Sequence, residues 1–228
     1  MPVSARTRAL AFTVVGSSER LSLSPRRLVI AGYTASDRAA VQAHIDELAH
    51  LGVAPPPRVP MFYDVPVGLA TTETVIVVEG AETSGEVEPV LISTGGRLYL
   101  AVGSDHTDRE VEKRDIAESK ASAAKPVGDH VVPVERATAV WDDIEMVCRL
   151  DGEIYQRGRL AAMLPPGTLL DKLRAVGGQP LAGEALMFCG TLPLLAGTFV
   201  FGTTYELELR LPDGTSLSHS YDVKRRSS

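Results

Sequence analysis

The sequence predicts an α+β fold that is mostly β, with a few short helices and a single domain spanning residues 1–228. Two observations lead to this prediction. Short runs of β-branched and other apolar residues recur along the chain, separated by Gly, Ser, Pro and Asp turns. Stretches with the 3.6-residue apolar period of a helix are few and short. With 228 residues, 44% of them hydrophobic, the chain is long enough to bury a sizeable core.

The expected strands follow one another along the whole sequence. Residues 1–30 contribute the N-terminal strands, and turn sequences separate the later ones. Asp151-Gly152 and Asp213-Gly214 have the composition of tight hairpin turns. We therefore expect strands at residues 10–15, 20–23, 27–31, 74–79, 86–93, 97–102, 145–150, 153–156, 185–189, 204–211 and 216–223.

One long helix is expected over residues 36–51. Val41 and Ile45 begin a series of apolar residues at helical spacing. Ser36 is the expected N-cap, because its hydroxyl can accept a hydrogen bond from a free backbone N–H. Gly52 is expected to end the helix.

Two shorter helices are expected later in the chain. One starts at Thr168 and ends before Gly177. The other starts at Thr107, where Thr-Asp-Arg-Glu has the form of a capping box. These elements are too few to change the mostly β character of the fold.

The charge balance argues against a nucleic-acid partner, since the net charge is −6 and the pI is about 5.4. The basic residues 224–226 are expected to form a frayed tail. No membrane is expected, because no apolar run approaches the ~20 residues of a spanning helix. Cys148 and Cys189 lie in apolar, strand-like runs and are expected as buried free thiols. A cytoplasmic location is the resulting expectation.

Three carboxylates are the most informative candidates for a functional site. Glu86 and Glu88 alternate along an expected strand and so project from the same face, about 7 Å apart along the backbone. Asp105 follows the next strand and can supply a third oxygen. Such a set suits a hard divalent cation. The alternative is two solvated strand glutamates and an unrelated loop aspartate, since residues 206 and 208 repeat the same Glu-x-Glu spacing.

Five segments, in chain order, resemble motifs of the fumarylacetoacetate hydrolase superfamily. Residues 85–88 (Gly-Glu-Val-Glu) resemble its Glu-x-Glu metal motif, and residues 104–109 (Ser-Asp-His-Thr-Asp-Arg) resemble its Asn-Asp-x-Ser-Ala-Arg segment. Lys120 with Pro126 and Gly128 resembles its Lys followed by Pro-x-Gly. Residues 150–156 resemble its Asn-Gly-Glu-x-x-Gln hairpin, and residues 181–191 resemble its Pro-Gly-Asp…Thr-Gly-Thr-Pro loop. The match covers about residues 30 to 210. The variant at 104–109 is similar to that of an uncharacterised bacterial branch.

The resemblance implies a fold, a cofactor and a class of substrate. It implies the mixed β-sandwich roll of the superfamily and a homodimer. It implies Mg²⁺ or Mn²⁺ bound by Glu86, Glu88 and Asp105. The implied substrate is a small 2-oxo acid or β-dicarbonyl, whose paired oxygens can chelate the ion.

Catalytic roles are expected for three side chains. His44 and Glu47 lie three residues apart on the expected long helix, so a carboxylate can orient the imidazole as a base for water. The alternative is an ordinary exposed pair on a helix. Lys120 resembles the active-site lysine of the superfamily, although the neighbouring Lys125 leaves the register open. His106 is a rival base, but a supporting hydrogen bond is its more natural role.

Three residues are expected to bind substrate. Arg109 can pair with a carboxylate through its planar fork, or alternatively with Glu112 three residues on. Gly190 and Thr191 offer a close backbone approach and a hydroxyl, unless they form a plain turn.

The sequence thus predicts a divalent-metal-dependent hydrolase that cleaves a C–C bond in a small 2-oxo acid or β-dicarbonyl. A decarboxylase or an isomerase that shares the enolate intermediate is one alternative. A non-catalytic keto-acid-binding protein of the same fold is another. Leu192 stands where the superfamily often has proline, and residues 62–66 replace its Phe-x-Lys-Pro, so the substrate is left open.

Overall fold

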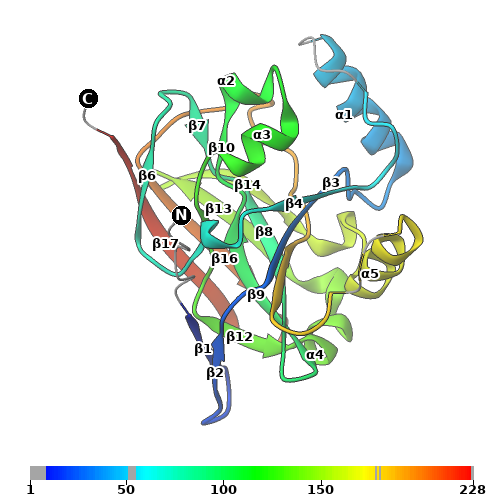
Figure 1. The fold of residues 1–228 in the computed structure, drawn as a ribbon, viewed down its shortest axis with the longest axis vertical. Helices are drawn as coiled ribbons and strands as arrows, with labels where there is room; N and C mark the ends of the chain where they lie inside the picture. The colour runs from blue at the N-terminus through cyan, green and yellow to red at the C-terminus, as the bar shows by residue number, and fades with distance from the viewer. Residues whose placement is uncertain (1–8, 51–54, 178, 180, 227–228) are drawn as a thin grey trace, which may run out of the picture.

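The structure is a computed structural model that describes residues 9–50, 55–177, 179 and 181–226. Two curled sheets face each other, and the helices lie around them (Figure 1). The larger sheet has eight strands within these residues. Its order is β2 (Arg20–Leu23), β1 (Leu10–Val14), β12 (His130–Pro133), β9 (Arg97–Ser104), β8 (Val87–Thr94), β15 (Ala185–Phe188), β3 (Arg27–Gly32) and β4 (Met61–Val65).

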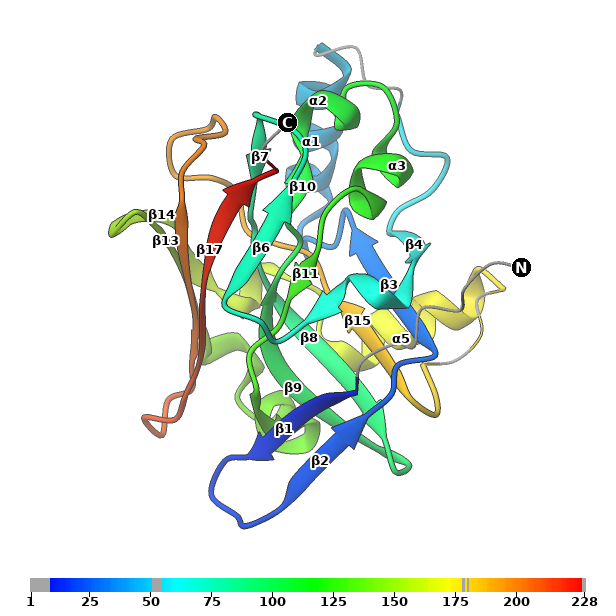
Figure 2. The same ribbon diagram turned by 60° about the vertical axis from the view of Figure 1, so that its left-hand side comes forward.

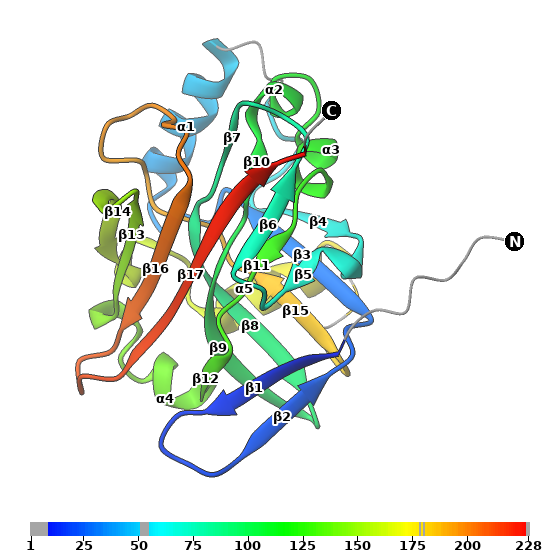
Figure 3. The same cartoon turned by 90° about the vertical axis from the view of Figure 1, so that its left-hand side faces the viewer.

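The second sheet has five strands in the described part of the chain. Its order is β14 (Glu153–Arg159), β13 (Glu145–Leu150), β16 (Thr204–Arg210), β17 (Ser216–Arg225) and β6 (Val75–Val78). Figure 3 shows β16, β17 and β6 side by side along one flank. Two short ladders complete the set, β10 (Thr107–Asp108) with β7 (Thr83–Ser84) and β11 (Lys125–Pro126) with β5 (Ala70–Thr71).

Both sheets mix parallel and antiparallel pairs. The pairs β1–β12, β15–β3 and β17–β6 are parallel, and the hairpins β8–β9, β13–β14 and β16–β17 are antiparallel. Parallel neighbours need long connections, so segments far apart in sequence meet in one sheet. The predicted fold class, a mostly β mixed sandwich roll, is confirmed.

The helices gather mainly at one end of the sheets. Figure 2 shows α1, α2 and α3 together at the end opposite the β1–β2 hairpin. The helices are α1 (Arg38–His50), α2 (Arg109–Glu112), α3 (Ile116–Ala121), α4 (Val134–Thr138) and α5 (Pro166–Ala175), with 3-10 turns η1 (Val67–Leu69), η2 (Trp141–Asp143) and η3 (Leu160–Ala162). No described helix has the length and apolar character needed to cross a membrane.

The central hairpin β8–β9 is buried on both faces. Along β8, Val87 and Leu91 join the larger core cluster, and Val90 and Ile92 join a second cluster. All eight residues of β8 are buried. A strand covered on both faces reads as a nearly continuous apolar run. Any charged residue placed within it must therefore have a partner.

Several sequence expectations on helix ends need correction. Asp37 caps α1, since its carboxylate accepts the backbone N–H of Ala39 at 2.8 Å, whereas the Ser36 hydroxyl donates to Ala161 O. Gly52, the expected end of this helix, lies outside the described residues. Asp108 caps α2 in place of Thr107, because its carboxylate accepts from two backbone N–H groups of the first turn.

Other boundaries also differ from expectation. The helix expected from Thr168 begins at Pro166, a residue favoured in the first turn because its missing N–H needs no partner there. Residues 224 and 225 belong to β17, where they pair with β6, so they are not a frayed tail. The strands β4 and β12 were not expected. Cys148 and Cys189 are buried free thiols, as predicted.

Candidate active site

The end of the β8–β9 hairpin brings two of the predicted carboxylates together. Glu88 pairs in register with Gly103, two residues before Asp105. The Asp105 N–H then donates to Glu86 O at 3.1 Å and continues the ladder past the strand ends. Glu88 and Asp105 are 2% and 0% exposed, values rare for carboxylates without partners.

Two lysines hold the carboxylate of Asp105. Lys120 Nζ lies 2.6 Å from Oδ2, and Lys125 Nζ lies 2.9 Å from Oδ1. Thr107 Oγ1 also donates to Oδ1 at 3.3 Å. Burial alone would raise the pKa of Asp105, but the two ammonium groups outweigh it and hold the pKa well below its usual range. The two lysines thus stabilise the ionised form of Asp105.

Glu88 lies against the loop that follows β15. The Gly190 N–H donates to Glu88 Oε2 at 2.8 Å. Burial, together with the charges of Asp105 and Glu86, raises the pKa of Glu88 well above its usual value, although Lys120 opposes the shift. An additional positive charge beside Glu88 would stabilise its ionised form.

Arg109 holds the third carboxylate. Its Nη2 lies 3.2 Å from Glu86 Oε2, and its Nη1 donates to Glu112 Oε2 at 2.7 Å. Its Nε donates to Ser84 Oγ at 2.7 Å, and the Phe199 ring lies 3.9 Å from the guanidinium carbon. Burial alone would lower the pKa of Arg109, but Glu86 and Glu112 outweigh it and raise the pKa. The guanidinium of Arg109, which was expected to pair with a substrate carboxylate, thus already binds protein groups. One of them is Glu112, the alternative partner predicted from the sequence.

Thr191 and Gln156 fasten the same loop to the hairpin. Thr191 Oγ1 donates to Val87 O at 2.7 Å and accepts from Gln156 Nε2 at 2.9 Å. Gln156 Nε2 also donates to Leu192 O, and its Oε1 accepts from Val87 N at 3.0 Å. Gln156 is fully buried. These contacts set the position of Gly190, the neighbour of Thr191, against Glu88.

His106 is directed into the interior between the sheets. Its Nδ1 lies 3.1 Å from the Tyr221 hydroxyl, and its ring packs edge-on against Tyr205 and Tyr221. Burial, helped by the charges of Lys125 and Arg109, lowers the pKa of His106 to about 3. The neutral form of the imidazole is therefore favoured, and the supporting role expected for His106 stays a prediction.

The backbone of His44 and Glu47 lies in α1, three residues apart, but their side chains lie outside the described part of the structure. Their predicted roles stay predictions. Lys125 is the residue that sequence reasoning left unplaced. Its signal was its position directly before the Pro-x-Gly segment, but only the fold, in which Val127 bridges to Gly103 on β9, shows it to be buried beside Asp105.

The donor chemistry of this cluster fits a hard divalent ion. Among the described residues, no three His, Cys, Asp or Glu side chains are grouped closely enough to hold a metal ion as they stand. The predicted carboxylates are instead turned partly toward lysine and arginine. Asp105 Oδ2, however, is a buried oxygen without a well-directed hydrogen bond from any described residue, although the ammonium of Lys120 is close. Carboxylate oxygens of this kind are the donors that Mg²⁺ and Mn²⁺ prefer.

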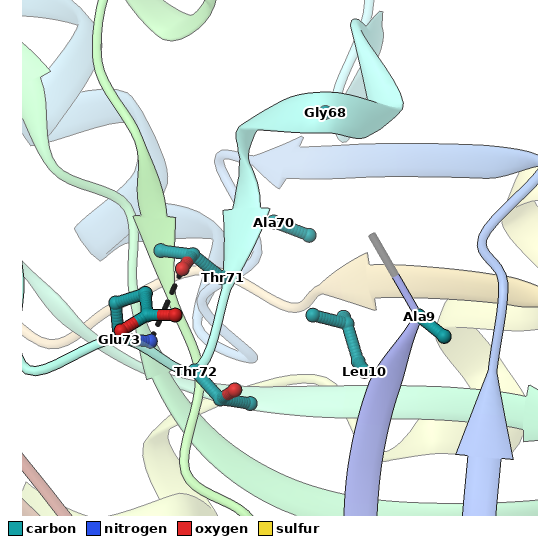
Figure 4. Close-up of a pocket in the computed structure, with 7 residues that line it drawn as sticks. All are labelled: Ala9, Leu10, Gly68, Ala70, Thr71, Thr72 and Glu73. Carbon is teal, nitrogen blue, oxygen red and sulfur yellow. Dashed lines mark hydrogen bonds between the residues drawn. The ribbon is translucent and has the colours of Figure 1, made fainter. Parts of the chain in front are cut away.

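A separate hollow of about 210 Å³ lies between β1 and the segment around β5 (Figure 4). Leu10 and Ala70 form part of its wall, and the backbone N–H of Glu73 donates to Thr71 Oγ1 at one side. None of the carboxylates or cations of the hairpin site lines this hollow. It is therefore not a part of the candidate active site.

The fold is that of fumarylacetoacetate hydrolase family proteins. A candidate fumarylacetoacetate isomerase/hydrolase from Oleispira antarctica superposes with a TM-score of 0.68 at 16% identity, over 93% of this chain and 99% of that chain. A fumarylpyruvate hydrolase from Pseudomonas aeruginosa, crystallised with Mn²⁺ and pyruvate, gives 0.64 at 18% identity over 96% and 97%. A 5-carboxymethyl-2-hydroxymuconate delta-isomerase from Mycobacterium smegmatis gives 0.64 at 15% over 93% and 87%.

A sequence family described as "Protein of unknown function (DUF2848)" matches residues 31–221, and the chain belongs to this family. The matched range contains the hairpin, both lysines and the loop after β15. A search of curated proteins finds no match. The resemblance inferred from the five motifs is thus confirmed in the fold.

Proposed function

We propose that this chain is a divalent-metal-dependent hydrolase that cleaves a C–C bond in a small 2-oxo acid or β-dicarbonyl. The observation that carries the proposal is the buried carboxylate pair Glu88 and Asp105 at the end of the central hairpin, with Lys120 2.6 Å from Asp105. Buried charges at such density stabilise a fold poorly and mark functional sites.

Glu86, Glu88 and Asp105 would hold Mg²⁺ or Mn²⁺. The bound ion would supply Lewis acidity toward a carbonyl oxygen of the substrate. Neighbouring groups of the chain hold these carboxylates in place. Arg109 orients Glu86, and the Gly190 N–H orients Glu88. The contacts of Arg109 support such positioning more directly than the binding of a substrate carboxylate.

Lys120 is the cation best placed to meet substrate. Burial alone would lower its pKa, but Asp105 and Glu112 outweigh it and raise the pKa above the usual lysine value. An ammonium with a raised pKa is a poor proton donor but a stable positive charge. We therefore assign Lys120 the role of binding the oxygen on which negative charge develops as the C–C bond breaks.

Water activation falls to the predicted pair His44 and Glu47 on α1. Figures 1 and 2 place α1 at the same end of the molecule as α2 and α3, the helices that carry Arg109 and Lys120. Gly190 and Thr191 would form the opposite wall of the site. The homodimer expected from the resemblance is part of this proposal.

A substrate screen tests the function. Acylpyruvates, oxaloacetate and related 2-oxo acids are incubated with the purified chain and Mn²⁺, with EDTA as the control. We expect hydrolysis of at least one acylpyruvate, its loss with EDTA, and a rate lowered roughly 100-fold or more in Lys120→Met. Lys113→Met, which removes an exposed lysine paired with Glu82 and Glu110, is the matched control.

The screen also separates the alternatives. Release of CO₂ would indicate a decarboxylase in place of the hydrolase. Formation of an isomer without cleavage of a C–C bond would indicate an isomerase. Binding of pyruvate with no turnover of any substrate would indicate a keto-acid-binding protein. Turnover that is unchanged by EDTA would contradict the dependence on a metal.

A further inference from the structure

Lys125 is a charged side chain for which the proposed chemistry has no use. It lies on β11 and is 0% exposed, so protein groups enclose it completely. Its Nζ donates to His106 O at 2.5 Å and lies 2.9 Å from Asp105 Oδ1. Burying a lysine ammonium completely costs a fold desolvation free energy, even when the charge is paired.

The charges around Asp105 show what this lysine adds. Among the described side chains, four carboxylates and three cations are linked by ion pairs or short-range electrostatics. We call this set the acid–base cluster: Glu86, Glu88, Asp105, Glu112, Arg109, Lys120 and Lys125. With all groups ionised the cluster has one negative charge in excess. A divalent ion changes this to one positive charge, whereas without Lys125 the loaded cluster would be neutral.

Two oxygen acceptors face the Lys125 ammonium. Burial lowers the pKa of Lys125, and the ion pair with Asp105 opposes that shift. Lys120 lies on the other oxygen of the same carboxylate, so the two ammonium groups share Asp105. The second acceptor, the His106 carbonyl, also binds the ammonium through a hydrogen bond.

We propose that Lys125 is a positioning residue that sets the charge of the active site. It fixes Asp105 through Oδ1, which leaves Oδ2 to Lys120, and it gives the metal-loaded cluster one excess positive charge. An anionic ligand then neutralises that charge. This inference rests on the proposed function, and it predicts that a divalent ion and a monoanion bind cooperatively while a neutral dicarbonyl does not.

Calorimetric titration of the metal-free full-length chain with Mn²⁺ tests the inference. The titration is repeated with pyruvate and with 2,3-butanedione, which has the same adjacent carbonyls but no charge. In the wild type, pyruvate is expected to lower the Mn²⁺ dissociation constant roughly tenfold or more. Butanedione is expected to leave that constant nearly unchanged.

Two substitutions separate charge from hydrogen bonding. Lys125→Gln keeps a donor for Asp105 and the His106 carbonyl but removes the charge, and Lys125→Met removes both. Each is expected to bind Mn²⁺ alone roughly tenfold more tightly, because a cation beside the ion has gone. The effect of pyruvate on Mn²⁺ binding should shrink in both. Lys113→Met, which is exposed and outside the cluster, should behave as the wild type.

The outcomes are distinct. Wild-type Mn²⁺ affinity in folded Lys125→Gln, or weaker affinity in both variants, would overturn the inference while leaving the metal site intact. No binding of Mn²⁺ to the wild type, even with pyruvate, would overturn the proposed function itself. If neither variant folds, the wild-type comparison still decides, since equal effects of pyruvate and butanedione would overturn the inference.

Discussion

Gly190 brings the loop after β15 against both Glu88 and Thr34. Its φ is +92°, a backbone conformation that L side chains rarely adopt. A Cβ at this position would also overlap Thr34 Oγ1. The same residue donates its N–H to Glu88. The position thus requires glycine for two independent reasons, and both concern the shape of the site.

Gly190→Ala should therefore destabilise the protein by about 2–4 kcal/mol, the sum of a left-handed backbone and a steric overlap. Gly214→Ala is the matched control, because its φ is +85° but a Cβ there meets nothing within 4 Å. That control should lose only about 1–2 kcal/mol. Urea denaturation measures both. Equal losses would contradict a close approach at Gly190.

His219 provides a prediction about pH. Burial lowers its pKa below the usual 6.5, and among the described residues no partner is present for its buried Nε2. The unfolded chain therefore binds a proton at His219 before the folded chain does. Stability from this source is present above pH 6.5 and is lost as the pH falls below that value.

The free energy of unfolding should accordingly fall less steeply between pH 7 and pH 5 in His219→Gln than in the wild type. Urea midpoints at several pH values measure the difference between the two slopes. Parallel slopes would show that His219 titrates alike in both states.

At the scale of elements, β14 joins the hairpin β8–β9 to the loop after β15 through one side chain. Gln156 accepts the Val87 N–H and donates to Thr191 Oγ1 and Leu192 O. Removing it leaves three polar groups without this partner, of which the Val87 N–H is buried. An unsatisfied buried polar group costs about 1–3 kcal/mol.

Gln156→Ala should thus lower the free energy of unfolding by about 2–4 kcal/mol and raise amide exchange at Val87. Gln42→Ala serves as the control, because this exposed glutamine makes one helix-surface contact with Asp46 and should cost less than about 0.5 kcal/mol. A small effect of Gln156→Ala would mean that the loop is held by other contacts.

Over the whole molecule, local sequence patterns predicted most of the strands but not which strands pair with one another. The β13–β14 and β16–β17 hairpins follow from the composition of their turns. The strand β4 was missed because β-forming residues 61–65 stand between prolines at 60 and 66. No local pattern predicts the bridge between Val127 and Gly103 at the end of β9, which brings Lys125 beside Asp105. The three carboxylates were proposed from sequence, whereas the ion pairs that hold Glu86 and Asp105 required the fold.

The spacing of Glu86 and Glu88 is repeated by Glu206 and Glu208 on β16, and the structure separates the two pairs. Glu88 is buried beside Asp105, while Glu206 is exposed on the five-stranded sheet. Glu208 is half-buried and accepts from Arg210 and Ser216. We therefore expect only the first pair to bind a divalent cation.

Calorimetric titration with Mn²⁺ of the wild type, Glu88→Gln and Glu206→Gln tests this claim most directly. The wild type and Glu206→Gln should each bind one Mn²⁺ per chain with the same affinity. Glu88→Gln should bind roughly 100-fold more weakly, because a charged ligand is replaced by a neutral one. Equal Mn²⁺ affinity in Glu88→Gln and the wild type would contradict the account.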